Sequence, residues 1–152
     1  TQKLGISGLI KLTLSMNLQT THKLERAIIV ALNLDGWSLE WTGGKFEHYD
    51  CVGTTPKGKD CVIEFKFRKT YYDTKILEKY KYDALMNLPY DIVKLYFVAD
   101  PKGNYLFWLN DLELKEVTTM LLPDTTLWTK AKVSKEVYLL KEEQAAIIQK
   151  NK

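Results

Sequence analysis

The chain has 152 residues, of which 22 are basic and 19 acidic, giving a net charge of +3 and a pI near 8.7. This length predicts one domain over residues 1–152. A composition of 45% hydrophobic and 27% charged residues excludes the disordered, collagen-like and disulfide-rich classes. No apolar run approaches the roughly 18 residues that a membrane-spanning helix needs. Two cysteines, Cys51 and Cys61, are too few for a disulfide-stapled secreted protein, so we expect a reducing, cytoplasmic environment and no membrane segment.

The N-terminal part of the chain predicts an arm, a helix and a strand. Residues 4–14 are apolar but interrupted by glycine and lysine, which favours a short strand or a docked arm over a signal peptide. A helix is expected from an N-capping Thr20 or Thr21 to Asn33, because apolar residues recur there at three- and four-residue spacing. Period-two alternation over residues 37–41 then predicts a strand.

The rest of the chain predicts four further strands, a second helix and a less regular tail. The core is expected over about residues 20–110 with the order α-β-β-β-α-β-β, which is an α/β fold. Residues 111–152 form a C-terminal extension, for which we expect an irregular stretch or a short helix, then a strand and a terminal helix. The expected ranges are strands at 46–53, 61–69, 92–99 and 105–109, a helix from Asp73 or Thr74 to Leu88, a tail strand near 126–132 and a terminal helix from Lys141.

The loop Thr55-Pro56-Lys57-Gly58 predicts a hairpin whose register can be worked out. Pro at the second position and Gly at the fourth are typical of a type I turn followed by a left-handed glycine. If Thr55 pairs with Lys59, Asp50 lies opposite Glu64. A one-residue slip would separate the two carboxylates. One sheet face then carries Phe46, His48, Asp50, Glu64, Lys66 and Arg68, and the other carries Cys51, Ile63, Phe65 and Phe67 for the core.

Asp50 and Glu64 are the residues whose pairing points to chemistry. Like charges directly across a hairpin repel each other, and a bound cation would relieve that repulsion. Carboxylate oxygens are hard ligands suited to Mg²⁺, which keeps open positions for a phosphate. Lys66 shares this face, where its ammonium would orient a water molecule or stabilise charge on phosphoryl oxygens. The pattern therefore predicts displacement at phosphorus.

The segment Tyr49-Asp50, followed after thirteen residues by Glu64-Phe65-Lys66, resembles the PD-(D/E)xK signature of restriction-endonuclease-like nucleases. Tyr49 stands where that signature usually has Pro. Glu25, on a helix before the strands, is similar to the extra acidic residue that many members place near the metal. The order of elements over about residues 20–109 most resembles the small Holliday junction resolvases and phage-encoded nucleases of this fold.

This resemblance implies a restriction-endonuclease-like core, with a mixed central sheet flanked by helices, and a metal-dependent DNA endonuclease activity. It implies that Asp50, Glu64, the Phe65 carbonyl and Glu25 hold Mg²⁺, or Mn²⁺ as a substitute. Asp50, Glu64 and Lys66 would then be the catalytic residues. A branched DNA junction is the first expected substrate, because no sequence-reading module is evident. Acting on two strands would suggest a homodimer with one site in each subunit.

Basic residues gather beside this pattern. Residues 56–82 hold eight basic and four acidic side chains, a net +4, so the rest of the chain sums to −1. Tyrosines are interleaved with these charges, as is typical of a surface that binds phosphates and stacks bases. The residues that we expect to bind nucleic acid are Arg68, Lys69, Lys75 and Lys79.

Two simpler interpretations stay open. Alternating charges on the strand of Glu64, Lys66 and Arg68 are also typical of a solvent-facing surface, and Glu25 on a helix edge is often only an ion-pair partner. A catalytically inactive nucleic-acid-binding or interaction protein that keeps the nuclease fold is therefore the alternative function. For Cys51 and Cys61, packing in the core is favoured over redox chemistry.

Overall fold

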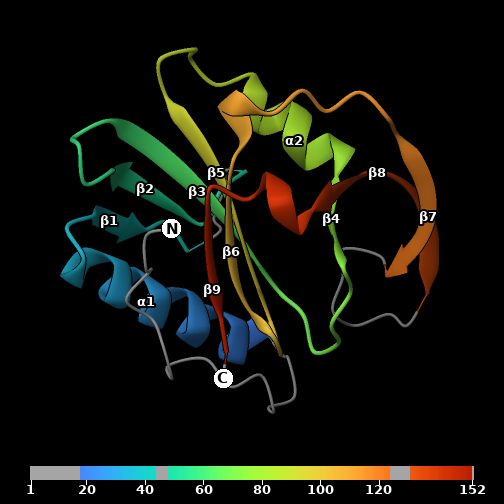
Figure 1. The fold of residues 1–152 in the computed structure, drawn as a ribbon, viewed down its shortest axis with the longest axis horizontal. Coiled ribbons are helices and arrows are strands. Elements are labelled where there is room, and N and C mark those ends of the chain that lie inside the picture. Colours follow the sequence, from blue (N-terminus) through green and yellow to red (C-terminus); the bar gives the residue numbers. More distant parts are fainter. Residues whose placement is uncertain (1–17, 44–47, 124–130, 152) are drawn as a thin grey trace.

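The computed structural model describes residues 18–43, 48–123 and 131–151 (Figure 1). The predicted arm at residues 4–14 and the predicted position of Phe46 lie outside these ranges. Neither of the two described α-helices is long and apolar enough to cross a membrane. The elements are α1 (Leu18–Leu34), β1 (Ser38–Trp41), β2 (Cys51–Thr54), β3 (Asp60–Phe67), β4 (Thr74–Glu78), α2 (Lys79–Met86), β5 (Val93–Asp100), β6 (Gly103–Trp108), η1 (Leu109–Asp111), β7 (Thr118–Pro123), β8 (Lys132–Lys141), η2 (Glu142–Gln144) and β9 (Ile147–Lys150).

A six-stranded sheet in the order β1-β2-β3-β5-β6-β9 forms the centre of the molecule. Strands β3 and β5 are parallel and the other neighbouring strands are antiparallel, so the sheet is mixed, as predicted. A second sheet has three antiparallel strands in the order β4-β8-β7. All eight residues of β5 are buried, as its continuous apolar sequence indicates for a strand covered on both faces.

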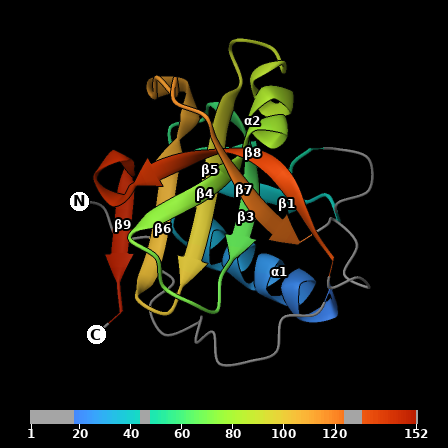
Figure 2. The ribbon, with the colours of Figure 1, turned by 90° about the vertical axis from the view of Figure 1, so that its right-hand side faces the viewer.

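Helix α1 covers one face of the central sheet, and α2 with the three-stranded sheet covers the other (Figures 1 and 2). The strand β3 contributes to both cores because its side chains alternate. Its odd-numbered residues, including Ile63 and Phe65, pack with the apolar stripe of α1, as predicted. On the even-numbered face, Val62 joins a second core with Leu77 of β4 and Leu85 of α2. That face is therefore covered rather than solvent-exposed, and the simpler surface interpretation of β3 is wrong.

Helix α1 begins at Leu18, two residues earlier than predicted, so Thr20 and Thr21 lie in its first turn and are not its caps. Its C-terminal end matches the prediction. Asn33 binds the backbone of Leu39 through both side-chain atoms, at 2.8 and 3.1 Å, which ties the helix to β1. Gly36 has a φ of +97°, a left-handed conformation that a residue with a Cβ rarely adopts.

The hairpin between β2 and β3 has the predicted register. The Thr55 N–H donates to the Lys59 carbonyl and the Gly58 N–H donates to the Thr55 carbonyl, both at 2.8 Å. Gly58 takes the left-handed conformation that the turn requires, with φ of +81°. Cys51 pairs with Ile63, as the register set by this turn requires. Both cysteines are free and buried in the core beside α1, in agreement with the packing role.

The predicted helix over residues 73–88 is a strand followed by a short helix. Residues 74–78 form β4, which pairs with β8, and only Lys79–Met86 are helical. Within β4 the buried residues alternate, with Lys75 and Leu77 pointing inward. This segment fits period two as well as a helical stripe, and pairing with a strand some sixty residues later decides between them.

The predicted terminal helix from Lys141 is also wrong. A single 3₁₀ turn, η2, is followed by β9, which pairs with β6 and adds the last strand to the central sheet. The predicted strand near residues 126–132 lies almost wholly outside the described residues, and β8 begins at Lys132. The extension after residue 111 therefore contributes to both sheets. Its backbone donors and acceptors are satisfied by strand partners far away in the sequence.

Candidate active site

Asp50 lies just beyond the end of the β2–β3 ladder. The ladder stops at Cys51, and Asp50 lies in a bend immediately before it. The carbonyl of Tyr49 accepts a hydrogen bond from the Thr42 hydroxyl at 2.9 Å. The Phe65 N–H donates instead to the Asp50 side chain, at 2.8 Å from Oδ2. The Asp50 carboxylate is thereby held against β3, one residue from Glu64.

Glu64 lies on the face of β3 that α2 covers, and it is only 7% exposed. Lys81 of α2 donates to its Oε1 at 3.0 Å. Burial, and then the nearby Asp50 carboxyl, raise the pKa of Glu64 to about 7, although Lys81 acts in the opposite direction. The pKa of Asp50 is also raised, mainly by burial, against the Phe65 hydrogen bond and Lys81. The two carboxyl groups are thus near neighbours that resist being charged together.

Glu25 of α1 reaches the same region from the other side of the sheet and is 3% exposed. Burial, and then Asp50, raise its pKa to about 8, with a smaller contribution from Glu64. The carboxyl groups of Glu25, Asp50 and Glu64 therefore act on one another's pKa. Glu25 is buried and is not a solvent-exposed ion-pair partner, and its role at a metal site stays a prediction.

Lys66 follows Glu64 on the same face of β3 and is half-buried. Burial, then Arg68 and Lys81, lower its pKa to about 8. Among the described residues no hydrogen bond or ion pair engages its ammonium. Lys66 is therefore both easier to deprotonate than an ordinary lysine and free to bind a ligand.

The donor chemistry of Asp50 and Glu64 fits a divalent cation. The buried Glu64 and the half-buried Asp50 both have carboxyl groups with raised pKa values, and these lose their mutual repulsion when a cation lies between them. Within residues 18–43, 48–123 and 131–151, however, no group of three or more His, Cys, Asp and Glu side chains is arranged to hold a metal ion. The Lys81 ammonium forms an ion pair with one carboxylate oxygen of Glu64.

The residues expected to bind nucleic acid differ in their exposure to solvent. Arg68 is half-buried and Lys69 exposed, and Lys79 pairs with Asp83 at 2.6 Å near the surface. The assignment of Lys75 is wrong, because its ammonium is buried against Asp100 at 2.7 Å and also lies over the Tyr71 and Tyr105 rings. A lysine that is 2% exposed cannot reach a phosphate without breaking that pair.

Two residues near the carboxyl groups were not singled out by the sequence analysis. Lys81 contacts Glu64, and His22 of α1 is close enough to Asp50 to lower its pKa. The sequence does indicate that Lys81 lies near the core. It comes three residues before Ala84 and four before Leu85, which places it at the edge of the apolar face of the helix. His22 lies one turn before Glu25, so both point in a similar direction.

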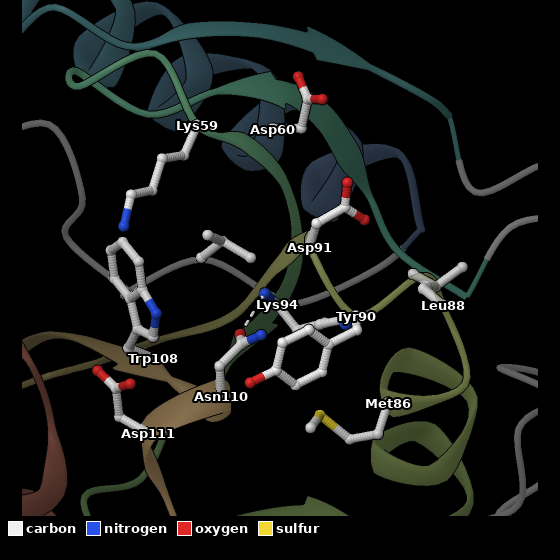
Figure 3. A pocket seen from close by; sticks show the side chains of 11 residues that line it. Lys59, Asp60, Met86, Leu88, Tyr90, Asp91, Lys94, Trp108, Asn110 and Asp111 are labelled. Atoms are coloured by element: carbon white, nitrogen blue, oxygen red, sulfur yellow. Dashed lines mark hydrogen bonds between the residues drawn. The ribbon is translucent and has the colours of Figure 1, made fainter.

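A cavity of about 530 Å³ lies elsewhere on the molecule, at the beginning of β3 and β5 (Figure 3). Lys94 and Asn110 are joined there by a 2.7 Å hydrogen bond from the Lys94 N–H. The lining holds three aspartates, at positions 60, 91 and 111, against Lys59 and Lys94, and this balance of charge does not favour a phosphate. None of the residues assigned to the candidate active site lines this cavity, so we do not place the site there.

The fold has a known counterpart. The structure superposes on that of Archaeoglobus fulgidus Hjc, a Holliday junction resolvase from an archaeal hyperthermophile, with a TM-score of 0.54 and 16% sequence identity over 82% of this chain and 93% of that chain. The chain has a restriction-endonuclease-like fold. In this fold Glu64 and Lys66 lie on β3, and Asp50 lies immediately before β2. No protein-family model and no curated protein sequence matches the chain.

Proposed function

We propose that this protein is a metal-dependent DNA endonuclease that hydrolyses phosphodiester bonds. The observation that carries the proposal is the placement of the half-buried Asp50 and the buried Glu64 as neighbouring carboxyl groups, with Lys66 on the same strand as Glu64, within a nuclease-like fold. The three residues come from the predicted motif, and the hairpin register that joins them was predicted independently of the fold comparison.

In the proposed site Asp50 and Glu64 hold a divalent cation, Mg²⁺ by preference, with the Phe65 carbonyl as a further ligand. Glu25 supports the site from α1. The cation supplies positive charge against the phosphate oxygens. Lys66, which has no acidic partner among the described residues, donates hydrogen bonds to the attacking water or to the phosphate. Arg68, Lys69 and Lys79 bind the DNA backbone.

A branched DNA junction is the proposed substrate, and the protein would act on it as a homodimer. The Hjc structure is that of a Holliday junction resolvase, which supports this choice among DNA substrates. A single chain carries one candidate site, and a two-fold dimer would present two such sites to opposite strands.

Two observations favour a second function. Lys81 already neutralises Glu64, and the described part of the chain has no ready three-ligand metal cluster. A protein that binds branched DNA without cutting it is therefore the alternative.

Cleavage of a four-way junction and of linear duplex, with Mg²⁺ or with EDTA, tests the two functions. The nuclease proposal expects Mg²⁺-dependent cutting that is lost in Asp50→Ala and in Lys66→Ala. Lys115→Ala is the matched control, because Lys115 is an exposed lysine paired only with Glu113. Junction binding without cutting by the wild-type protein would support the alternative. Equal cutting by Lys66→Ala would overturn the assignment of Lys66.

A further inference from the structure

Lys81 is the one cation in direct contact with the candidate metal-binding carboxylates among the described residues. Its Nζ lies 3.0 Å from Oε1 of Glu64. Its charge also lowers the pKa of Asp50 and of Lys66, so it lies near both. The ammonium therefore contacts Glu64 directly and acts electrostatically on Asp50 and Lys66.

The position of Lys81 is fixed by the packing of α2. Leu85, one turn later, is fully buried in the second core. Tyr82 stacks edge-to-face on Tyr138 of β8, with ring centroids 5.0 Å apart. The helix is thus anchored at two positions that follow Lys81. The lysine side chain itself keeps four rotatable bonds, so the ammonium can change partner without any movement of the backbone.

A comparison with Lys75 shows that Lys81 is not built as a permanent structural cation. Lys75 is 2% exposed and has Asp100, the Tyr72 carbonyl and Glu142 as partners. Lys81 is 29% exposed, and Glu64 is the only acceptor of its ammonium in the described structure. An ammonium has three N–H donors. Lys81 therefore has unused donors on a partly exposed side chain beside the proposed site of reaction.

We propose that the Lys81 ammonium binds the Glu64 carboxylate when no metal is bound. Once a divalent cation binds Glu64, the ammonium binds a phosphate oxygen of the DNA instead. This inference rests on the proposed nuclease function. It assigns a second phosphate-binding lysine, on α2, that the Glu64-Phe65-Lys66 pattern does not contain. It also explains why the neighbouring carboxyl groups of the buried Glu64 and the half-buried Asp50 are tolerated without a metal, since Lys81 compensates part of the charge.

Metal binding and DNA binding, both measured without turnover, test this role. The variants are Lys81→Met, which keeps the length of the side chain, Lys81→Gln in case the first does not fold, and Lys115→Met as the matched control. Mn²⁺ binding is measured by calorimetry, and junction binding is measured in Ca²⁺ and in EDTA. Loss of the competing ammonium should raise Mn²⁺ affinity by about tenfold in the Lys81 variants. Junction affinity should fall by about fivefold or more in Ca²⁺, and by less in EDTA.

The outcomes separate this inference from the proposed function. Unchanged or weaker Mn²⁺ binding by the Lys81 variants would overturn it, as would a loss of junction affinity that is the same with and without metal. In either case, Mg²⁺-dependent cutting by the wild-type protein would leave the nuclease proposal standing. If the wild-type protein binds neither Mn²⁺ nor the junction, both proposals fail together.

Discussion

The backbone N–H of Phe65 donates a 2.8 Å hydrogen bond to Oδ2 of Asp50. This bond fixes the Asp50 carboxylate beside Glu64. The β2–β3 ladder has already ended here, so without Asp50 the Phe65 amide would have no acceptor on that side of β3. It joins the hairpin to the candidate site through one side chain. Substitutions of Asp50 can therefore separate its structural role from its charge.

Asp50→Asn should keep the fold and lose the activity. Its amide oxygen can still accept from the Phe65 N–H, whereas the negative charge is gone, so we expect cleavage to fall at least about 100-fold. Asp50→Ala removes the hydrogen bond as well, and should be less stable than Asp50→Asn by about 1–2 kcal/mol. Urea unfolding in EDTA measures the stability difference. Cutting by Asp50→Asn at the wild-type rate would show that Asp50 only holds the backbone.

The metal-free protein should become less stable as the pH rises from about 4.5 to 8. The pKa of Glu64 is about 7 and that of Glu25 about 8 in the folded chain, above their ordinary value of 4.5. The folded state therefore holds protons that the unfolded state has released, and this stabilisation is lost as the pH rises through the folded pKa values. In Glu64→Gln, the free energy of unfolding should fall by ~2 kcal/mol less over this pH range than it does in the wild-type protein. Unfolding in EDTA at several pH values measures it, and an unchanged slope in the variant would contradict it.

Gly53→Ala should weaken the hairpin that carries the site. A Cβ at this position would lie 1.9 Å from the Ser38 carbonyl oxygen of β1, which is backbone and cannot move aside alone. We expect a loss of about 2–3 kcal/mol in the free energy of unfolding. The neighbouring Val52→Ala, on an exposed side chain, is the control and should cost less than about 1 kcal/mol. Equal stability of the two variants in urea would show that β1 and β2 pack less closely than described.

Lys75→Met should destabilise the fold rather than weaken DNA binding. The change leaves Asp100 buried without its ion-pair partner, which typically costs about 3–5 kcal/mol. Lys69→Met, at an exposed position, should leave stability unchanged and reduce DNA affinity. Thermal unfolding and junction binding of both variants give the comparison. A stable Lys75→Met with weakened binding would restore the original assignment of Lys75 to the DNA surface.

The predictions that held depend on contacts that are close in the sequence. The Thr55-Pro56-Lys57-Gly58 turn is only a few residues from the strands that it joins, so its geometry determines which residues of β2 and β3 lie opposite each other. Helix α1 and the buried β5 were predicted from their own hydrophobic patterns for the same reason. The predictions that failed, at β4 and β9, depend on partners in β8 and β6 that lie about 45 to 65 residues away.

The sequence by itself therefore determined the hairpin, its register and the proximity of Asp50 to Glu64, because turn chemistry and side-chain alternation are local. Only the tertiary structure decided what covers that pair. Packing of α2 against β8 brings Lys81 onto Glu64, and the salt bridge of Lys75 with Asp100 removes Lys75 from the surface. A hydrophobic pattern shows that a helix face or a strand is buried, but the burial free energy is the same for many partners. Which charged side chains meet inside the fold is decided by the arrangement of the whole chain.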